Sequence, residues 1–179
     1  MSEFTKIKQS FFFEQNKITT YCFLYFRIIF FRSASEITVP SETTHLNLSS
    51  NNLISTDGIS GLPDLEFLDL SFNKFEQIKD SSFKDLPKLK VVNLSNNVHL
   101  RIVDDYSFFS LPKLEFVTLR NSASLAWISY RAFYDSYNVK ELDLSFTNIT
   151  ALQAEFKKIS SALVLTKISV FEQKNLILK

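Results

Sequence analysis

The stretch Leu65-Glu66-Phe67-Leu68-Asp69-Leu70-Ser71-Phe72-Asn73 decides the fold of this chain. It has the form L-x-x-L-x-L-x-x-N, in which x is any residue. Alternate side chains of an extended segment face opposite ways, so Leu68 and Leu70 point into a core while the residues between them line an open face. The amide of Asn73 can satisfy backbone groups that would otherwise be buried unpaired. The stretch therefore predicts a short strand with one buried face, followed by a turn that an asparagine holds.

The same pattern recurs along the 179-residue chain. A Leu-Pro pair introduces three copies at intervals of 24 and 25 residues, at Leu62-Pro63, Leu86-Pro87 and Leu111-Pro112. Five copies fill the four pattern positions, and they use Thr43, Leu46, Leu48 and Asn51; Leu65, Leu68, Leu70 and Asn73; Leu89, Val92, Leu94 and Asn97; Leu114, Val117, Leu119 and Ser122; and Val139, Leu142, Leu144 and Thr147. A weaker sixth copy, whose lead-in lacks Leu-Pro, has Leu165, Ile168, Val170 and Gln173.

Self-similarity at this period predicts a solenoid, because no single coil can bury its own apolar face and stability comes from stacking. Phe83, Phe108 and Phe133 occupy one equivalent place in successive copies. We expect them to stack as a second apolar spine on the convex side. Ser122 and Thr147 stand where Asn is expected, and their shorter side chains predict looser fourth and fifth coils.

Copies three and four carry one extra residue after the Asn position. Leu100 and Leu125 then take the core place that Phe75 holds in copy two. The shared insertion predicts a matching bulge on one edge of the solenoid. Trp127 lies between the core positions Leu125 and Ile128, so packing is its expected role.

The segment 1–36 differs from the repeats and predicts an apolar N-terminal leader or cap. Tyr21 to Phe31 is almost wholly apolar apart from Arg27, and Ser33-Ala34-Ser35 is a small-x-small pattern suited to signal-peptidase cleavage before Glu36. The alternatives are a hydrophobic strand that caps the first repeat, or a mis-assembled N-terminus. A membrane-spanning helix needs ~20 apolar residues, about twice this run, so membrane association is left open without a predicted span.

Leu65 to Phe75, together with Phe83 and Leu86-Pro87, resembles the 24-residue class of leucine-rich repeats that is typical of extracellular and receptor proteins. Ile37-Thr38-Val39-Pro40 resembles the end of the N-terminal cap in such proteins. The resemblance covers about Ile37 to Leu152. It implies an α/β horseshoe with a curved parallel β-sheet on the concave side and short helices or irregular coils on the convex side. It also implies protein binding on the concave face.

The chain thus divides into a leader or cap (1–36), leucine-rich repeats (37–152) and a degenerate final repeat or C-terminal tail (153–179). The cysteine-rich caps usual in extracellular relatives are absent, since Cys22 is the single cysteine. This departure leaves open a fragment, a degenerate member, or ends that other residues cover.

Composition and motifs argue against catalysis and against nucleic acid. The formal net charge is +1, which gives no electrostatic case for nucleic acid or an anionic membrane. Only two glycines occur, and no phosphate-binding loop, dinucleotide fingerprint or hydrolase elbow is present. His45 and His99 lack a partner at ligand spacing, and Asp104-Asp105 is interpreted as a solvated loop. We therefore predict a protein that is not an enzyme and has no cofactor, metal or small-molecule substrate.

The outward-facing strand positions predict where a protein partner binds. One column alternates in charge, and we interpret it as cross-strand pairing: Thr44, Glu66, Lys90, Glu115, Lys140. The next column holds the apolar residues Phe67, Val91 and Phe116 between His45 and Glu141. Exposed apolar and aromatic residues often anchor interfaces, so these three are the predicted hot spot, although shielding of the sheet is an alternative. The predicted polar surround is Asp69, Asn93, Thr118 and Arg120.

Three N-x-S/T triplets are candidate glycosylation sites, at Asn47, Asn93 and Asn148. The first two would place glycans on the concave face, and Asn148 lies past the strand and is the most plausible acceptor. The leading hypothesis is a secreted or cell-surface module that binds a protein ligand or receptor. The alternatives are an incomplete or structural repeat fragment, and an intracellular scaffold.

Overall fold

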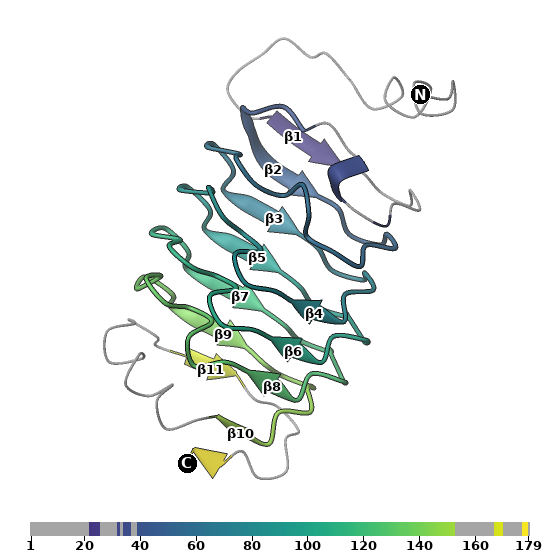
Figure 1. Ribbon diagram of the computed structural model, residues 1–179, viewed down its shortest axis with the longest axis vertical. Helices are drawn as coiled ribbons and strands as arrows, with labels where there is room; N and C mark the ends of the chain where they lie inside the picture. The colour runs from purple at the N-terminus through teal and green to yellow at the C-terminus, as the bar shows by residue number, and fades with distance from the viewer. Residues whose placement is uncertain are drawn as a thin grey trace.

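One parallel sheet runs the length of the molecule, and each of the five predicted repeats contributes a strand to it (Figure 1). The computed structural model describes residues 22–25, 32, 34–36, 39–152, 167–169 and 177–178. The strand order is β1-β2-β3-β5-β7-β9-β11. The bounds along this order are Cys22–Tyr25, Thr43–Asn47, Phe67–Asp69, Val91–Asn93, Phe116–Thr118, Glu141–Asp143 and Lys167–Ser169.

The register of this concave sheet follows the sequence pattern. Leu68 of β3 pairs with Val92 of β5, which pairs with Val117 of β7. These side chains are buried, whereas the residues on either side of them in each strand are half-buried or exposed. The middle residue of each strand therefore lies in the core and the residues beside it lie on the open face, as the two-residue period of a strand requires.

The strand of the sixth copy continues the sheet. β11 pairs with β9, and Ile168 lies opposite Leu142, as the spacing of that copy predicts. The other positions of the copy, Leu165, Val170 and Gln173, lie outside the described residues.

On the convex side the described residues form turns and two-residue strands instead of α-helices. A three-stranded parallel sheet joins β4 (Gln77–Ile78), β6 (Ile102–Val103) and β8 (Trp127–Ile128). A second, two-stranded sheet pairs β10 (Ala151–Leu152) with β12 (Ile177–Leu178). Within the described ranges the helical structure is one 3-10 turn, η1 (Ala34–Glu36).

The expectation of short helices is therefore wrong for the described coils, and the irregular-coil alternative is confirmed. Each convex segment contains residues with left-handed φ, which an α-helix does not accommodate. Ser81 and Asp85 have φ of 55° and 58° in one coil, and Tyr106 and Ser110 have 55° and 52° in the next.

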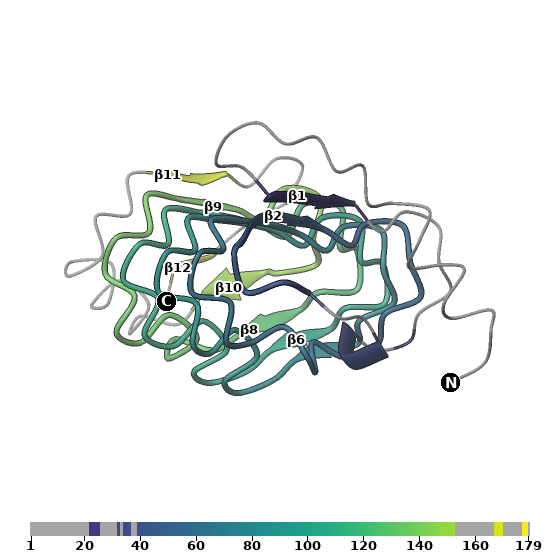
Figure 2. The ribbon, with the colours of Figure 1, turned by 90° about the horizontal axis from the view of Figure 1, so that it is seen from above.

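Leucines and phenylalanines fill the space between the concave and convex sheets. Figure 2 shows the two sheets end-on. The predicted phenylalanine spine is present: Phe83, Phe108 and Phe133 are buried. The ring centroids of Phe83 and Phe108 are 5.0 Å apart, and those of Phe108 and Phe133 are 4.8 Å apart with planes within 3°. The spine ties three successive coils together along the solenoid axis.

The asparagines form the predicted ladder between coils. The Asn73 side-chain N–H groups donate to the carbonyls of Leu48 and Leu70 at 2.9 and 3.0 Å, and its Oδ1 accepts the Leu53 backbone N–H at 3.0 Å. Asn97 repeats the arrangement one coil further on, and its Oδ1 accepts the Asn73 N–H.

The ladder weakens where the asparagine is replaced. The hydroxyl of Ser122 is buried without a hydrogen-bond partner. The hydroxyl of Thr147 donates to the Leu144 carbonyl at 2.8 Å. The Ser122 hydroxyl thus makes none of the ladder contacts of Asn73 and Asn97, as predicted for the fourth coil.

The two inserted residues produce matching turns. The Leu100 N–H donates to the Asn97 carbonyl, and the Leu125 N–H donates to the Ser122 carbonyl, both at 2.9 Å. Leu100 and Leu125 are buried in the place of Phe75, so the insertion leaves the core register intact.

At the N-terminal end, β1 pairs in parallel with β2. A strand at this position is what the cap alternative predicts, and the division between a leader and a cap stays a prediction because most of 1–36 lies outside the described residues. No helix in the described part of the chain is long and apolar enough to cross a membrane.

Candidate protein-binding surface

The predicted hot spot lies in register on the open side of the concave sheet. Phe67 pairs with Val91, and Val91 pairs with Phe116. Phe116 is 41% exposed, and the other two side chains are half-buried. Because neighbouring strands lie ~4.8 Å apart, the three side chains form a continuous apolar row across three coils. We call these three residues the concave row.

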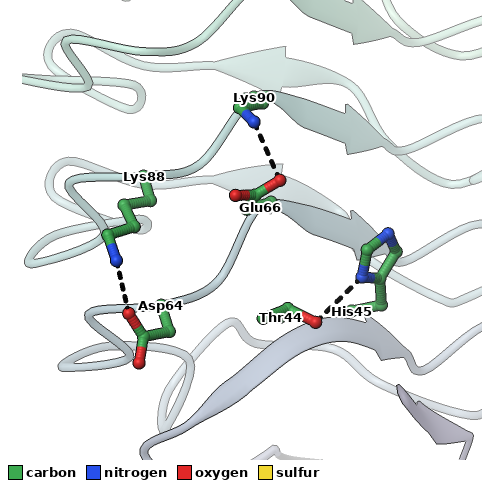
Figure 3. A network of polar contacts seen from close by, with 6 residues as sticks. All are labelled: Thr44, His45, Asp64, Glu66, Lys88 and Lys90. Carbon is green, nitrogen blue, oxygen red and sulfur yellow. Dashed lines mark hydrogen bonds and ion pairs between the residues drawn. The ribbon is translucent and has the colours of Figure 1, made fainter. Parts of the chain in front are cut away.

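Polar residues close both ends of the concave row. At one end, the His45 ring stacks on Phe67 with centroids 5.8 Å apart and planes within 22°. The Nδ1 atom of His45 lies 3.1 Å from the Thr44 hydroxyl (Figure 3). At the other end, Glu141 pairs with Phe116 across the strands. The row is therefore a bounded patch on the sheet.

Ion pairs flank the row on the side where the strands begin. The Lys90 ammonium lies 2.8 Å from the Glu66 carboxylate, and Lys140 lies 2.8 Å from Glu115. Lys88 and Asp64 form a further pair at 2.6 Å on the same edge (Figure 3). The alternating charges are thus used in cross-strand pairing, as predicted, and each exposed pair contributes little stability.

The Lys90 contact also changes the titration of Glu66. The hydrogen bond from Lys90 lowers the pKa of the Glu66 carboxyl below its ordinary value, with further lowering by the positive charge of Lys90. The hydrogen bond to Asp64 raises the pKa of the Lys88 ammonium. Both groups therefore stay charged over a wider pH range than they would alone.

On the other side of the row, the predicted polar surround holds the turns that follow the strands. The side-chain oxygens of Asp69 and Asn93 accept the backbone N–H of Ser71 at 2.9 Å and of Ser95 at 3.1 Å. Thr118 accepts the Arg120 N–H at a longer 3.4 Å. These contacts give Asp69, Asn93 and Thr118 a structural role, and their part in binding stays a prediction.

Arg120 is the exposed cation of this surround. Its guanidinium lies 4.8 Å from the centroid of the Phe146 ring, which is cation–π distance. The Arg120 side chain is exposed, so its charge stays accessible beside the ring. Its role in binding also stays a prediction.

The three sequons differ in accessibility. Asn148 is exposed. Asn47 and Asn93 are half-buried, and their Oδ1 atoms accept hydrogen bonds from the hydroxyls of Ser49 at 2.7 Å and Ser95 at 2.5 Å. The structure thus favours the acceptor that lies off the concave face.

The packing role expected for Trp127 is wrong, because its side chain is 45% exposed on the convex sheet. Within β8 the residues alternate, so Ile128 points inward and Trp127 outward, beside the exposed Ile102 of β6. Side chains of a strand alternate between its two faces, so the residue next to the core position Ile128 should face outward. This is the sequence signal that could have revealed the orientation.

Sequence reasoning also missed an aromatic cluster on the convex side. Phe109 and Tyr134 stack with centroids 6.3 Å apart, and Tyr106 meets both rings edge-on at 5.9 and 5.7 Å. In the preceding coil Lys84 occupies the place of Phe109. Within the described residues, the aromatic surface therefore begins in the third coil and continues in the fourth.

The acidic pair Asp104-Asp105 joins neighbouring coils, so its interpretation as a simple solvated loop is wrong. Asp104 accepts a hydrogen bond from Gln77, and Asp105 accepts one from Ser129. The guanidinium of Arg131 lies 3.6 Å from Asp105. Among the described residues, no group of three or more His, Cys, Asp or Glu side chains could hold a metal ion.

Comparison with known families matches the repeats directly. The family described as "Leucine rich repeat" matches residues 68–123, and the family described as "Leucine Rich repeats (2 copies)" matches residues 44–86. The chain contains a leucine-rich-repeat domain. Both matches lie inside the range that the repeat pattern predicts.

Individual relatives of this leucine-rich-repeat chain resemble parts of it. Chaoptin of Drosophila melanogaster is 41% identical over 59 residues, which cover 31% of this chain and 4% of Chaoptin. The crystal structure of human 5T4 (trophoblast glycoprotein) covers 75% of this chain and 71% of its own, with 14% identity and a TM-score of 0.36. A chain in the structure of the Drosophila Toll–Spatzle complex matches 90% of this chain over 26% of its own length, with 19% identity and a TM-score of 0.37.

Proposed function

We propose that this leucine-rich-repeat domain binds a protein ligand or receptor through its concave face, without catalysis, and does so outside the cell. The observation that carries the proposal is the concave row: Phe67, Val91 and Phe116 lie in register on the open side of the sheet. These apolar side chains lie outside the buried solenoid core, and aromatic anchors dominate the energy of many interfaces.

The surroundings of the row support the same proposal. Ion pairs border it on one side, and a polar column with Arg120 borders it on the other. An apolar centre with a polar rim is the usual anatomy of a protein interface. The extracellular location rests on the resemblance to the 24-residue repeat class and on the exposed sequon at Asn148.

Site-specific photo-cross-linking tests which face binds. A benzophenone side chain would replace Phe116 on the concave face. The matched control replaces Ile102 on the convex sheet. Both residues are exposed, and they lie in strands of two consecutive coils, β7 and β6. We expect a discrete cross-linked partner from position 116 and none from position 102. Cross-linking from position 102 alone would move the binding site to the convex aromatic surface.

Affinity measurements on the captured partner complete the test. Phe67→Ala combined with Phe116→Ala should weaken binding by about a hundredfold or more, since each buried aromatic anchor is worth roughly 2 kcal/mol. The circular dichroism of the double variant should be unchanged because neither side chain lies in the core. Unaltered affinity in the folded double variant would contradict the proposal.

A further inference from the structure

Two described stretches of the N-terminal segment lie against the first repeat. β1 pairs in parallel with β2 along the open end of the concave sheet (Figure 1). Leu24 of β1 lies opposite Leu46, which is fully buried, so Leu24 holds a core position of the repeat register. The second stretch is the 3-10 turn η1. Both stretches fall inside the segment 1–36, for which the sequence leaves a leader and a cap as alternatives.

The turn η1 fits closely against the first coil. Ala34 is 2% exposed and belongs to the hydrophobic core. Just before the turn, the carbonyl of Arg32 accepts the Ile54 backbone N–H at 3.0 Å. A Cβ atom added at Gly58 would lie 2.5 Å from the backbone nitrogen of Ser35, so only a glycine lets these two backbones come so close. The first coil is therefore shaped to receive this turn.

These contacts oppose removal of the segment by cleavage before Glu36. The small-x-small pattern at 33–35 suits signal peptidase, yet its middle residue, Ala34, is packed in the core. Cleavage at this place would also leave the edge of β2 without the strand that now pairs with it. An open strand edge and an uncovered solenoid end both favour aggregation. The segment thus has the contacts of a structural cap.

β1 also adds a strand to the face that we propose binds a protein. Phe23 pairs with His45, and His45 pairs with Phe67, so Phe23 holds the register position of the concave row. At ~4.8 Å per strand, the five repeat strands alone span ~19 Å, whereas all seven strands span ~29 Å. A standard interface buries ~800 Å² on each partner, which is a patch about 30 Å across. A partner centred on the concave row therefore reaches β1.

We propose that residues 22–36 form an N-terminal cap that the folded protein retains, and that β1 is the first strand of its protein-binding face. The cap takes the place of the cysteine-rich cap that extracellular relatives usually have, and it needs no disulfide because Cys22 is the single cysteine. Cleavage anywhere before Cys22 leaves it intact. The part that concerns binding rests on the function proposed above, whereas the part that concerns retention does not.

Limited trypsin digestion of the full chain tests whether the cap is folded. Trypsin cleaves after Arg32, whose side chain is exposed and whose carbonyl is bonded to Ile54. We expect this bond to resist cleavage in the wild type. Ala34→Asp places a carboxylate in the core and should speed cleavage at least about tenfold, because proteolysis follows the population of the opened form. Ser35→Asp, at the exposed neighbour, is the matched control and should leave the rate unchanged.

Mass spectrometry of the digests measures the three rates. Rapid cleavage after Arg32 in a wild-type chain whose repeats stay intact would overturn the cap. Equal rates in wild type, Ala34→Asp and Ser35→Asp would overturn it as well, because Ala34 would then not be packed.

Photo-cross-linking tests the binding part. A benzophenone side chain at Phe23 should capture the same partner as one at Phe116, and one at Ile102 should not. The Phe23 variant should keep the wild-type resistance to trypsin; if it does not, Tyr25, which pairs with Asn47 in the same strand, takes the probe. Capture from Phe116 without capture from β1 would overturn the extension to β1 and leave the proposed function standing. Capture from neither would contradict the proposed function and the extension together.

Discussion

At the scale of single residues, the asparagine ladder shows how one side chain joins the turns of two successive coils. Asn97 donates to the carbonyls of Leu70 and Leu94 and accepts the N–H of Asn73, all from within the core. Ser122 takes the same place one coil later, with its hydroxyl buried and without a hydrogen-bond partner. A buried polar atom in this state costs free energy that a hydrogen bond would recover.

Ser122→Asn should therefore stabilise the chain. Asn97 is buried at the equivalent place in the preceding coil, which has the same insertion, so an asparagine side chain fits this kind of turn. We expect the free energy of unfolding to rise by about 1 kcal/mol, measured by urea denaturation. Ser122→Ala is the control, since it removes the unpaired hydroxyl without extending the ladder and should have a smaller effect. A destabilised Ser122→Asn variant would mean that this coil is too tight for the amide.

At the scale of elements, the phenylalanine spine and the backbone both join the convex coils. The Phe108 N–H donates to the Ala132 carbonyl at 2.8 Å, and the Ser129 N–H donates to the Val103 carbonyl at 2.9 Å. Stacked, buried rings add side-chain contacts along the same direction. The convex side is thus held from coil to coil by backbone hydrogen bonds and by ring packing.

Phe108→Ala should be among the most destabilising single substitutions in the chain, because its ring contacts the spine on both sides. Truncation of a buried Phe costs roughly 3–5 kcal/mol. Chemical denaturation would measure the loss, and Phe116→Ala on the open face is the matched control, expected to change stability by less than about 1 kcal/mol. Equal effects of the two substitutions would contradict the assignment of Phe108 to the core.

The ion pairs of the concave sheet should make stability depend on pH in the acid range. The pKa of Glu66 is lowered in the folded state, so its stabilising contribution is present above the unfolded pKa and is lost as the pH falls through the folded value. Lys90→Met removes the cause of the shift. The stability difference between wild type and Lys90→Met should therefore be larger at about pH 7 than at about pH 2.

The matched control for this pH dependence is Lys113→Met, a substitution at an exposed lysine that forms no ion pair among the described residues. Urea denaturation at both pH values and at low salt would measure each difference. A wild-type advantage over Lys90→Met that does not shrink in acid would show that Glu66 is not the titrating partner.

At the scale of the whole molecule, four surfaces have different characters. The concave face presents the apolar row between polar flanks, and the convex face presents an exposed tryptophan and an aromatic cluster. One edge carries the exposed ring of Phe72, and the other carries an open groove lined by Pro63, Leu86, Pro87, Phe109 and Pro112. A glycan at Asn148 would leave the concave row open, whereas a glycan at Asn93 would sit beside it.

Expression of the chain through a eukaryotic secretory route tests this arrangement. Asn148 is exposed, while the Asn93 side chain is engaged with Ser95, so we expect glycan at Asn148. Intact mass spectrometry should show a glycan mass that Asn148→Gln removes and Asn93→Gln retains. Glycan at Asn93 would argue against the concave row as the binding site.

The sequence by itself determined the repeat, its register and the core. Leu68, Asn73 and Phe108 recur at fixed spacing because each coil must meet the next at the same positions, so periodicity alone identifies what is buried. The charge pairing of Glu66 with Lys90 followed from the same register. These features repeat from coil to coil, which is why a pattern reveals them.

Only the tertiary structure decided the features that do not repeat. Trp127 and Ile102 form an exposed apolar pair on the convex face because the two-residue strands of their coils meet there in one sheet. The left-handed turn at Phe72, the coil-to-coil contacts of Asp104 and Asp105, and the groove beside Phe109 depend on backbone conformation and on neighbours from other coils. Core packing is periodic and readable along the chain, whereas surface shape arises from contacts between coils that no single stretch of sequence contains.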